Sequence, residues 1–282
     1  MHEIRAGRDD VFAFKLVFEE NPHRNDPIDL DVGLSWGSFQ IWANGENICA
    51  HYEQEEIVDA VHWYVLPLIE WIAEQWDPLF HEERLPNKNV KYYAWSSLRA
   101  TCLPPFAVGQ DEAQANKWEE AWSKWWRRHC LRSCREGGLF PDVVFRRWRD
   151  EIEISWGQSR ISGMPEHYRF LSSRGAARIE PMIVADALFD VLERAANYLR
   201  SQNPSSNRLA ELQRKIADLP SRRRDDRLMW LAGLGIEGWQ RIRHSINDFK
   251  NAACEILSQP EQNELVVMGS CEAALMFGTV SP

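Results

Sequence analysis

The sequence predicts an α+β protein in which N-terminal antiparallel β-hairpins pack with tryptophan-rich helices and an all-helical C-terminal part follows. Three observations predict this class. Two N-terminal stretches alternate apolar with polar residues, as half-buried strands do. A middle stretch repeats apolar residues every three or four positions, and helical periodicity dominates beyond Pro181. We therefore expect an α+β domain over residues 1–178 and a helical domain over residues 179–282, with the boundary at residues 174–181.

The first strand is expected over residues 11–18, because every second position holds a large apolar side chain: Phe12, Phe14, Leu16 and Phe18. Residues 34–42 alternate again and lead into Asn44-Gly45, a pair that favours the positive φ angles of a tight hairpin before residues 47–49. A second hairpin is expected from residues 143–148 and 151–156, joined at Arg149-Asp150.

A helix is expected over residues 56–80, with Pro67 as a kink or a restart. Residues 86–111 lack a period and contain Pro104-Pro105, which predicts a loop region. A second helix should begin at Asp111 and end before Gly137-Gly138. The face that it would bury holds Trp118, Trp122, Trp125 and His129.

Helical periodicity beyond Pro181 predicts four further helices, at residues 182–200, 207–219, 225–234 and 237–257. Pro220 is one of the expected breaks between them.

The net charge of −9 is unevenly distributed along the chain. Residues 1–86 contain 18 acidic against 5 basic residues, whereas residues 87–178 contain 16 basic against 10 acidic residues. The two segments either face each other or meet different partners, and we favour mutual contact. A whole-chain pI near 5.5 is atypical of a surface that follows a phosphate backbone.

Six cysteines lie far apart in the 282 residues, which indicates free thiols in a reducing compartment. Charged residues interrupt every apolar run well before the ~20 residues of a membrane span, and no basic start leads into a short apolar segment. We expect a cytoplasmic protein without a membrane partner.

The sequence contains no phosphate-binding loop, no dinucleotide-binding glycine motif, no Gly-x-Ser-x-Gly and no His-Glu-x-x-His. We therefore expect no cofactor and favour a protein that is not an enzyme. His81-Glu82-Glu83-Arg84 begins like a zinc peptidase motif, but Leu85 stands where the second histidine is required. Cys130 and Cys134 lie beside His129 at a spacing that suits two metal ligands, yet a structural zinc site needs four. We expect these cysteines to be small buried residues instead.

Four of the 14 tryptophans lie within residues 118–126. Such a cluster is typical of a core, a protein interface or a base-stacking platform, and we favour the core. Trp125 and Trp126 are adjacent and cannot both point fully inward, so one of them is a candidate surface anchor. The candidate partner-binding residues are Trp125, Trp126, Arg127, Arg128, Arg146 and Arg147.

Three segments of the chain share their pattern with a known family: residues 65–73 with 76–86, residues 128–132 with 136–142, and residues 274–282. They contain the strings Trp76-Asp77-Pro78-Leu79-Phe80, Glu136-Gly137-Gly138-Leu139-Phe140 and Met276-Phe277-Gly278-Thr279. Together they resemble the long N-terminal, non-catalytic region of large bacterial proteins whose C-terminal part is an ImmA/IrrE-type zinc metallopeptidase. The resemblance spans most of the chain.

The resemblance implies regulated proteolysis in stress response, mobile-element control or phage defence, with this chain as a sensing, substrate-presenting or inhibitory module. It carries over no catalytic residue, because the zinc motif is missing. The peptidase part would follow at about Pro282, so the chain is expected to be a truncated piece, a processed fragment or a stand-alone partner.

The leading hypothesis is therefore a non-enzymatic regulatory, sensing or protein-interaction module, whose partner is a peptidase or a regulated substrate. The alternative is a nucleic-acid-binding component of a bacterial defence complex, because residues 124–149 hold 8 basic against 2 acidic residues among aromatic rings. A third possibility is a hydrolase built from dispersed histidine and acidic residues.

Overall fold

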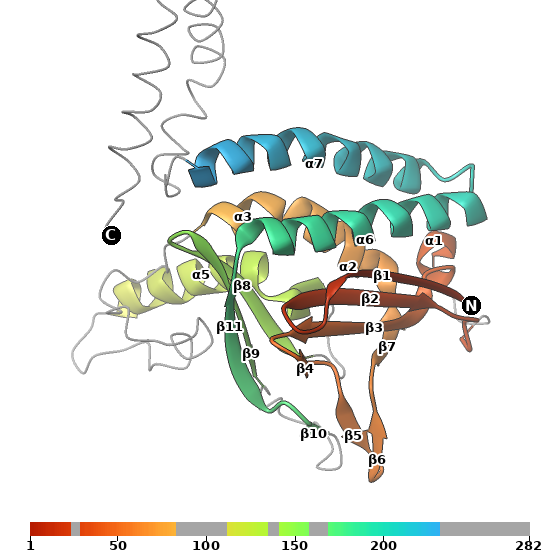
Figure 1. Ribbon diagram of the computed structural model, residues 1–282, viewed down its shortest axis with the longest axis horizontal. Coiled ribbons are helices and arrows are strands. Elements are labelled where there is room, and N and C mark those ends of the chain that lie inside the picture. The colour runs from red at the N-terminus through yellow and green to blue at the C-terminus, as the bar shows by residue number, and fades with distance from the viewer. Residues whose placement is uncertain (24–28, 83–111, 135–140, 158–168, 232–282) are drawn as a thin grey trace, which may run out of the picture.

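A computed structural model describes residues 1–23, 29–82, 112–134, 141–157 and 169–231. Helices and antiparallel sheets occur together, which confirms the α+β class (Figure 1). The predicted loop at residues 86–111 and the helix predicted at residues 237–257 lie outside the described residues.

The largest sheet consists of β1 (His2–Arg8), β2 (Phe12–Phe18), β3 (Trp36–Ala43), β4 (Glu46–Asn47) and β7 (Val61–Tyr64). The strands follow the order β1-β2-β3-β4, and β7 also pairs with β3. The expected first strand and the expected hairpin are confirmed, with Asn44 at φ 51° and Gly45 at φ 82° in its turn. β1 was not predicted from the sequence, because only Ile4 and Ala6 of this strand are buried apolar residues.

Two smaller sheets complete the β structure. One contains β5 (His51–Glu53), β6 (Glu56–Val58) and β10 (Arg169–Phe170), and the other β8 (Asp142–Trp148), β9 (Glu151–Gly157) and β11 (Arg174–Ile179). The predicted hairpin of β8 and β9 is confirmed, and Arg149 in its turn has φ 55°. A hydrogen-bonded chain links the sheet of β8, β9 and β11 to the first sheet: Trp156 Nε1 donates to Ser172 Oγ at 2.7 Å, and Ser172 Oγ donates to Glu46 at 2.5 Å.

The helix predicted over residues 56–80 begins nine residues later than expected. Residues 56–64 form β6 and β7 instead, and the helical part is divided into α2 (Val65–Glu74) and α3 (Trp76–His81). Backbone pairing with β5 and β3 outweighs the helical period there, because short runs such as Val58 to Val61 suit either structure. Pro67 lies in the first turn of α2, where its missing N–H costs no helical hydrogen bond.

The tryptophan helix, α5 (Glu112–His129), ends earlier than predicted. After His129 the chain forms a bridge between Cys130 and Val144 of β8, then a single 3₁₀ turn at Leu131–Cys134. The bridge pulls the backbone out of the helix well before Gly137-Gly138, which lies outside the described residues.

The C-terminal helices are α6 (Pro181–Gln202) and α7 (Asn207–Leu231), while α1 (Leu30–Gly33) is a single turn near the N-terminal sheet. The predicted break at Pro220 is wrong, because α7 continues through this residue. The turns that precede Pro220 are held by a buried leucine and isoleucine face: Leu209, Leu212, Ile216 and Leu219.

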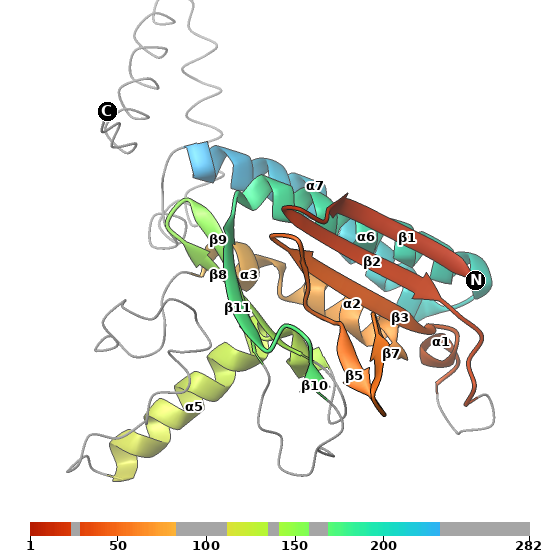
Figure 2. The ribbon, with the colours of Figure 1, turned by 60° about the horizontal axis from the view of Figure 1, so that its bottom comes forward.

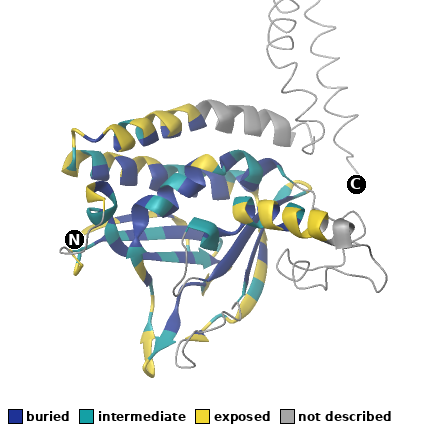
Figure 3. Ribbon diagram, turned by 180° about the vertical axis from the view of Figure 1, so that it is seen from behind, coloured by how far each residue is buried: buried dark blue, intermediate teal, exposed yellow. Residues whose placement is uncertain are grey.

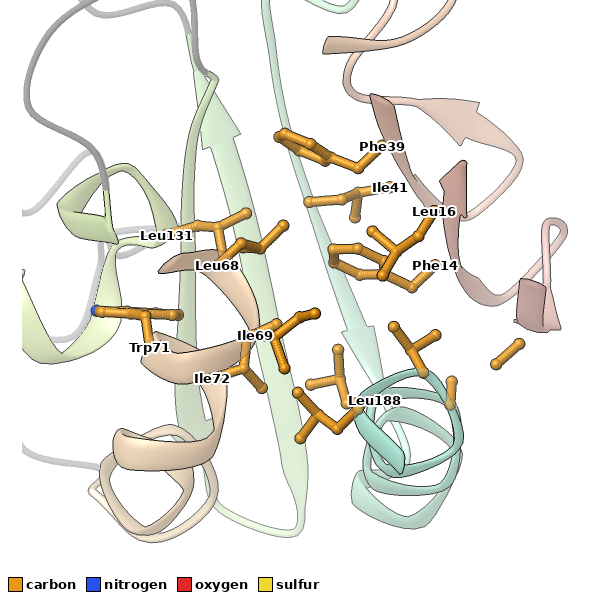
Figure 4. Packing of buried hydrophobic residues seen from close by; sticks show 14 of the residues in the cluster. Phe14, Leu16, Phe39, Ile41, Leu68, Ile69, Trp71, Ile72, Leu131 and Leu188 are labelled. Carbon is orange, nitrogen blue, oxygen red and sulfur yellow. The ribbon is translucent and has the colours of Figure 1, made fainter. Parts of the chain in front are cut away.

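One hydrophobic cluster contains side chains from the largest sheet and from α2, α6 and α7. α6 packs on β1 and β2, α2 lies beside it, and α7 covers both helices from outside (Figure 1). Figure 4 shows Ile69 of α2 pointing toward Phe14 of β2, with Leu188 of α6 in the same cluster. The cluster contains residues from both sides of the boundary expected at 174–181, and the division into two domains stays a prediction.

A transmembrane helix is not found within the described ranges, where no helix combines sufficient length with sufficient apolar character.

Candidate functional site

The C-terminal end of α5 is joined to the end of α3 by a charged clamp, Glu82, Arg128 and His129. Arg128 binds both carboxylate oxygens of Glu82, with Nη2 to Oε1 at 2.8 Å and Nε to Oε2 at 3.1 Å. His129 Nε2 lies 3.1 Å from Oε2 of the same carboxylate. The ring of His129 stacks on Trp125 with a centroid distance of 4.3 Å. The clamp therefore anchors α5 at one end, while much of the rest of this helix is exposed (Figure 3).

The buried ring of His129 lies between two hydrogen-bond acceptors. Its Nδ1 is 2.7 Å from the carbonyl oxygen of Phe145, and its Nε2 faces Glu82. Burial lowers the pKa of His129, although Glu82 acts in the opposite direction. A neutral imidazole donates only one hydrogen bond, so one of the two contacts lacks its proton when His129 is uncharged.

The same contacts favour the ionised form of Glu82. Burial alone would raise the pKa of Glu82, but the hydrogen bonds from His129 and Arg128 outweigh it and lower this pKa. Glu82 therefore stays ionised as the anionic centre of the clamp.

The basic residues of β8 are not placed on an open surface. Arg146 and Arg147 are 1% and 3% exposed. Arg146 lies 3.3 Å from Glu153 of β9, and Arg178 of β11 lies 3.6 Å from the other oxygen of Glu153. Arg147 Nε donates to the backbone carbonyl of Arg149.

The ring of Trp148 completes this cross-strand row. Arg146 and Arg178 lie 4.7 and 4.6 Å from its centroid, within the range of cation–π contacts. The row of charges therefore joins β8, β9 and β11 on one face of their sheet.

The six predicted partner-binding residues are thus divided between interior and surface. Trp125, Arg146 and Arg147 are buried, Trp126 and Arg128 are half-buried, and Arg127 is exposed. As expected for adjacent tryptophans, Trp125 points inward more completely than Trp126. The partner-binding role of the six residues stays a prediction.

The acidic N-terminal segment and the basic middle segment meet at the clamp. Glu82 binds Arg128, and Trp71 Nε1 of α2 donates to the carbonyl oxygen of Arg127 at 2.9 Å. Arg146 instead pairs with an acid of its own segment, Glu153. The expected mutual contact is therefore found for Arg128, whose partner Glu82 lies in the acidic segment.

A second surface, which was not predicted from the sequence, is the outer face of β1, β2 and β3. The core side chains of these strands point toward α2 and α6, and Figure 2 shows those helices behind the strands. The strand register and the Ser38–Glu19 contact place the buried Ala13 and nine larger side chains on the opposite face: Glu3, Arg5, Lys15, Val17, Glu19, Trp36, Ser38, Gln40 and Trp42. We call these nine residues the outer sheet face. The alternation of polar or tryptophan residues with other apolar residues along β3 was the sequence signal for this face.

The outer sheet face combines paired charges with half-buried tryptophans. Lys15 lies 3.3 Å from Glu3, and Ser38 donates to Glu19 at 3.1 Å. Trp36 and Trp42 lie at opposite ends of β3, and both are half-buried. This mixture of rings and balanced charge suits contact with a protein surface.

Metal ligands are not gathered in the described part of the chain, where no three histidine, cysteine or acidic side chains are placed to share an ion. Cys130 is fully buried, which raises the pKa of its thiol well above the usual range. His81 ends α3, Glu82 belongs to the clamp, and Leu85 lies outside the described residues.

Comparisons with family models, with curated proteins and with solved structures gave no match.

Proposed function

We propose that this chain is a non-enzymatic regulatory module that binds another protein through its outer sheet face. The observation that carries the proposal is the presence of Trp36 and Trp42 on a sheet face to which both charge signs contribute. Tryptophan is among the residues that dominate the binding energy of protein interfaces, and balanced charge does not favour a phosphate-rich ligand.

The proposed biological setting rests on the resemblance of the three segments to metallopeptidase-associated proteins. It supports a partner that is a bacterial peptidase or its regulated substrate, in stress response or phage defence. A cytoplasmic location is part of the proposal, supported by the free thiols of Cys49, Cys130 and Cys134.

Site-specific photo-crosslinking in cells tests the proposed face. A photoreactive residue replaces Gln40 at the centre of β3, and a matched control replaces Glu193, an exposed residue of α6. We expect a protease-sensitive, nuclease-resistant adduct from Gln40 that is absent from Glu193 and is lost after Trp36→Ala with Trp42→Ala. An adduct that nuclease removes, or equal labelling from both positions, would contradict the proposal.

Nucleic-acid binding is the second candidate function, and the exposure of Arg127 beside the half-buried Trp126 favours it. The internal ion pairs of Arg128 and Arg146 argue against it, because these charges are already partly neutralised. Titration with labelled single- and double-stranded nucleic acids at two salt concentrations separates the two functions. Submicromolar binding at physiological salt that Arg127→Glu abolishes would favour the second.

A further inference from the structure

β1 is an edge strand of the largest sheet. It pairs with β2 along all seven of its residues, and its other side meets no strand among the residues that the structure describes. Figure 2 shows β1 at the outer margin of the sheet. The unpaired backbone of such an edge can accept a further strand.

The backbone of β1 shows which residues would form hydrogen bonds outward. The carbonyl oxygen of Arg5 accepts a hydrogen bond from Arg194 of α6 at 3.1 Å, so it is directed away from β2. Peptide groups two residues apart in an antiparallel strand have the same orientation, so the backbone carbonyl of Glu3 also points away from β2. The side chains of Glu3 and Arg5 are each 52% exposed.

We propose that two copies of this chain associate by antiparallel pairing of their β1 strands, with Ile4 opposite Ile4 of the second copy. In this register Glu3 of each copy lies opposite Arg5 of the other, giving two pairs of opposite charge. A shift by one residue in each strand would place Arg5 opposite Arg5 and lose both pairs. Opposite charges directly across a ladder stabilise it and like charges destabilise it, so charge selects the first register.

The helix above β1 fits this arrangement. α6 runs antiparallel to β1, since Tyr198 stacks on His2 at 4.2 Å and Ala187 lies next to Gly7. Because α6 contacts both β1 and β2, it lies about half a strand spacing inside the edge. Two strands paired at about 4.8 Å would then hold the two α6 helices about 10 Å apart, close to the usual distance of packed helices.

The flank of α6 beside the edge is also complementary to itself. Asp190 and Arg194 are separated by one turn and are about half exposed. In an antiparallel pair of α6 helices centred between them, Asp190 of one copy faces Arg194 of the other. The hydrogen bond from Arg194 to the carbonyl of Arg5 must break before the strands pair. The guanidinium of Arg194 can then bind the carboxylate of Asp190 in the second copy.

Complementary charge reversals test the proposal without disturbing the core. Glu3→Arg places two arginines opposite each other in its own dimer, and Arg5→Glu places two glutamates opposite each other. A heterodimer of the two variants has both pairs restored. Arg8→Glu is the matched control, because Arg8 lies on β1 outside the paired register. Light scattering after size-exclusion chromatography measures the mass, and circular dichroism verifies folding.

We expect the unmodified chain and the Arg8→Glu control to be dimers at a concentration at which each single variant is a monomer. Mixing equal amounts of Glu3→Arg and Arg5→Glu should restore the dimer mass, with native mass spectrometry showing one copy of each. An unmodified chain that is monomeric at every concentration, single variants that remain dimers, or a mixture that remains monomeric would each overturn the proposal. None of these outcomes depends on the proposed protein-binding role of the outer sheet face.

Discussion

Arg128 at the end of α5 donates to both carboxylate oxygens of Glu82, which lies 46 residues earlier in the chain. The pair connects the end of α3 to the end of α5, and the buried His129 contacts the same carboxylate of Glu82. Residues from the acidic and the basic segments thus meet at one partly buried point. This contact should therefore contribute to the stability of the fold.

Glu82→Gln should destabilise the fold by about 1–3 kcal/mol, because it leaves a partly buried arginine without its charged partner. Urea denaturation measures the change. Glu120→Gln is the control, since Glu120 forms an ion pair with Lys124 on the exposed part of α5 and its removal should leave the midpoint unchanged. Equal midpoints for both variants would show that the clamp contributes nothing to stability.

Stability should fall as the pH is lowered below the ordinary pKa of histidine. Burial depresses the pKa of His129 in the folded protein, so the unfolded chain binds the proton first and acid favours unfolding. The loss begins near pH 6.5 and grows until the folded-state pKa of His129 is reached. Glu82, whose pKa is also lowered, adds a second loss below its ordinary range near pH 4.3.

His129→Gln tests the first of these losses, because glutamine can still donate to the Phe145 carbonyl but does not titrate. The variant should show a smaller decrease in urea midpoint between pH 7.5 and pH 5.5 than the unmodified chain. His62→Gln, at an exposed position, should retain the original decrease. A pH dependence that His129→Gln leaves intact would assign the loss to another group.

Trp122→Ala should cost about 3–5 kcal/mol of folding free energy, the usual range for truncating a buried large aromatic residue. Trp122 is 6% exposed and packs edge-on against Trp125 at a centroid distance of 5.6 Å. Trp126→Ala, at a half-buried position on the same helix, should cost less. Denaturation midpoints in the reverse order would mean that the exposed side of α5 is the side required for folding.

Ser206→Ala should destabilise the protein by about 1–2 kcal/mol. Ser206 Oγ accepts from the N–H of Leu209 in the first turn of α7 and donates to Asp31 at 2.5 Å, so one hydroxyl joins α7 to α1. The neighbouring Ser205 is exposed and bonds only locally to Asn203. Thermal unfolding should therefore show a lower midpoint for Ser206→Ala and an unchanged one for Ser205→Ala.

Local patterns in the sequence determined several elements of this protein. Phe12 and Phe14 alternate with less apolar residues, and Asn44-Gly45 supplies two positive φ angles, so the strand and the hairpin follow from pleat and turn geometry. The buried faces of α5 and α6 follow from the helical period in the same way.

Only the tertiary structure decided which charges are available to a partner. Arg127 and Arg146 look alike in the sequence, yet one is exposed and the other lies against Glu153 inside a sheet. Tertiary pairing likewise made residues 56–64 two strands and placed β1 at a sheet edge. Periodicity states which side chains share a face, but a distant segment determines what covers that face, and the burial of a charge depends on that cover.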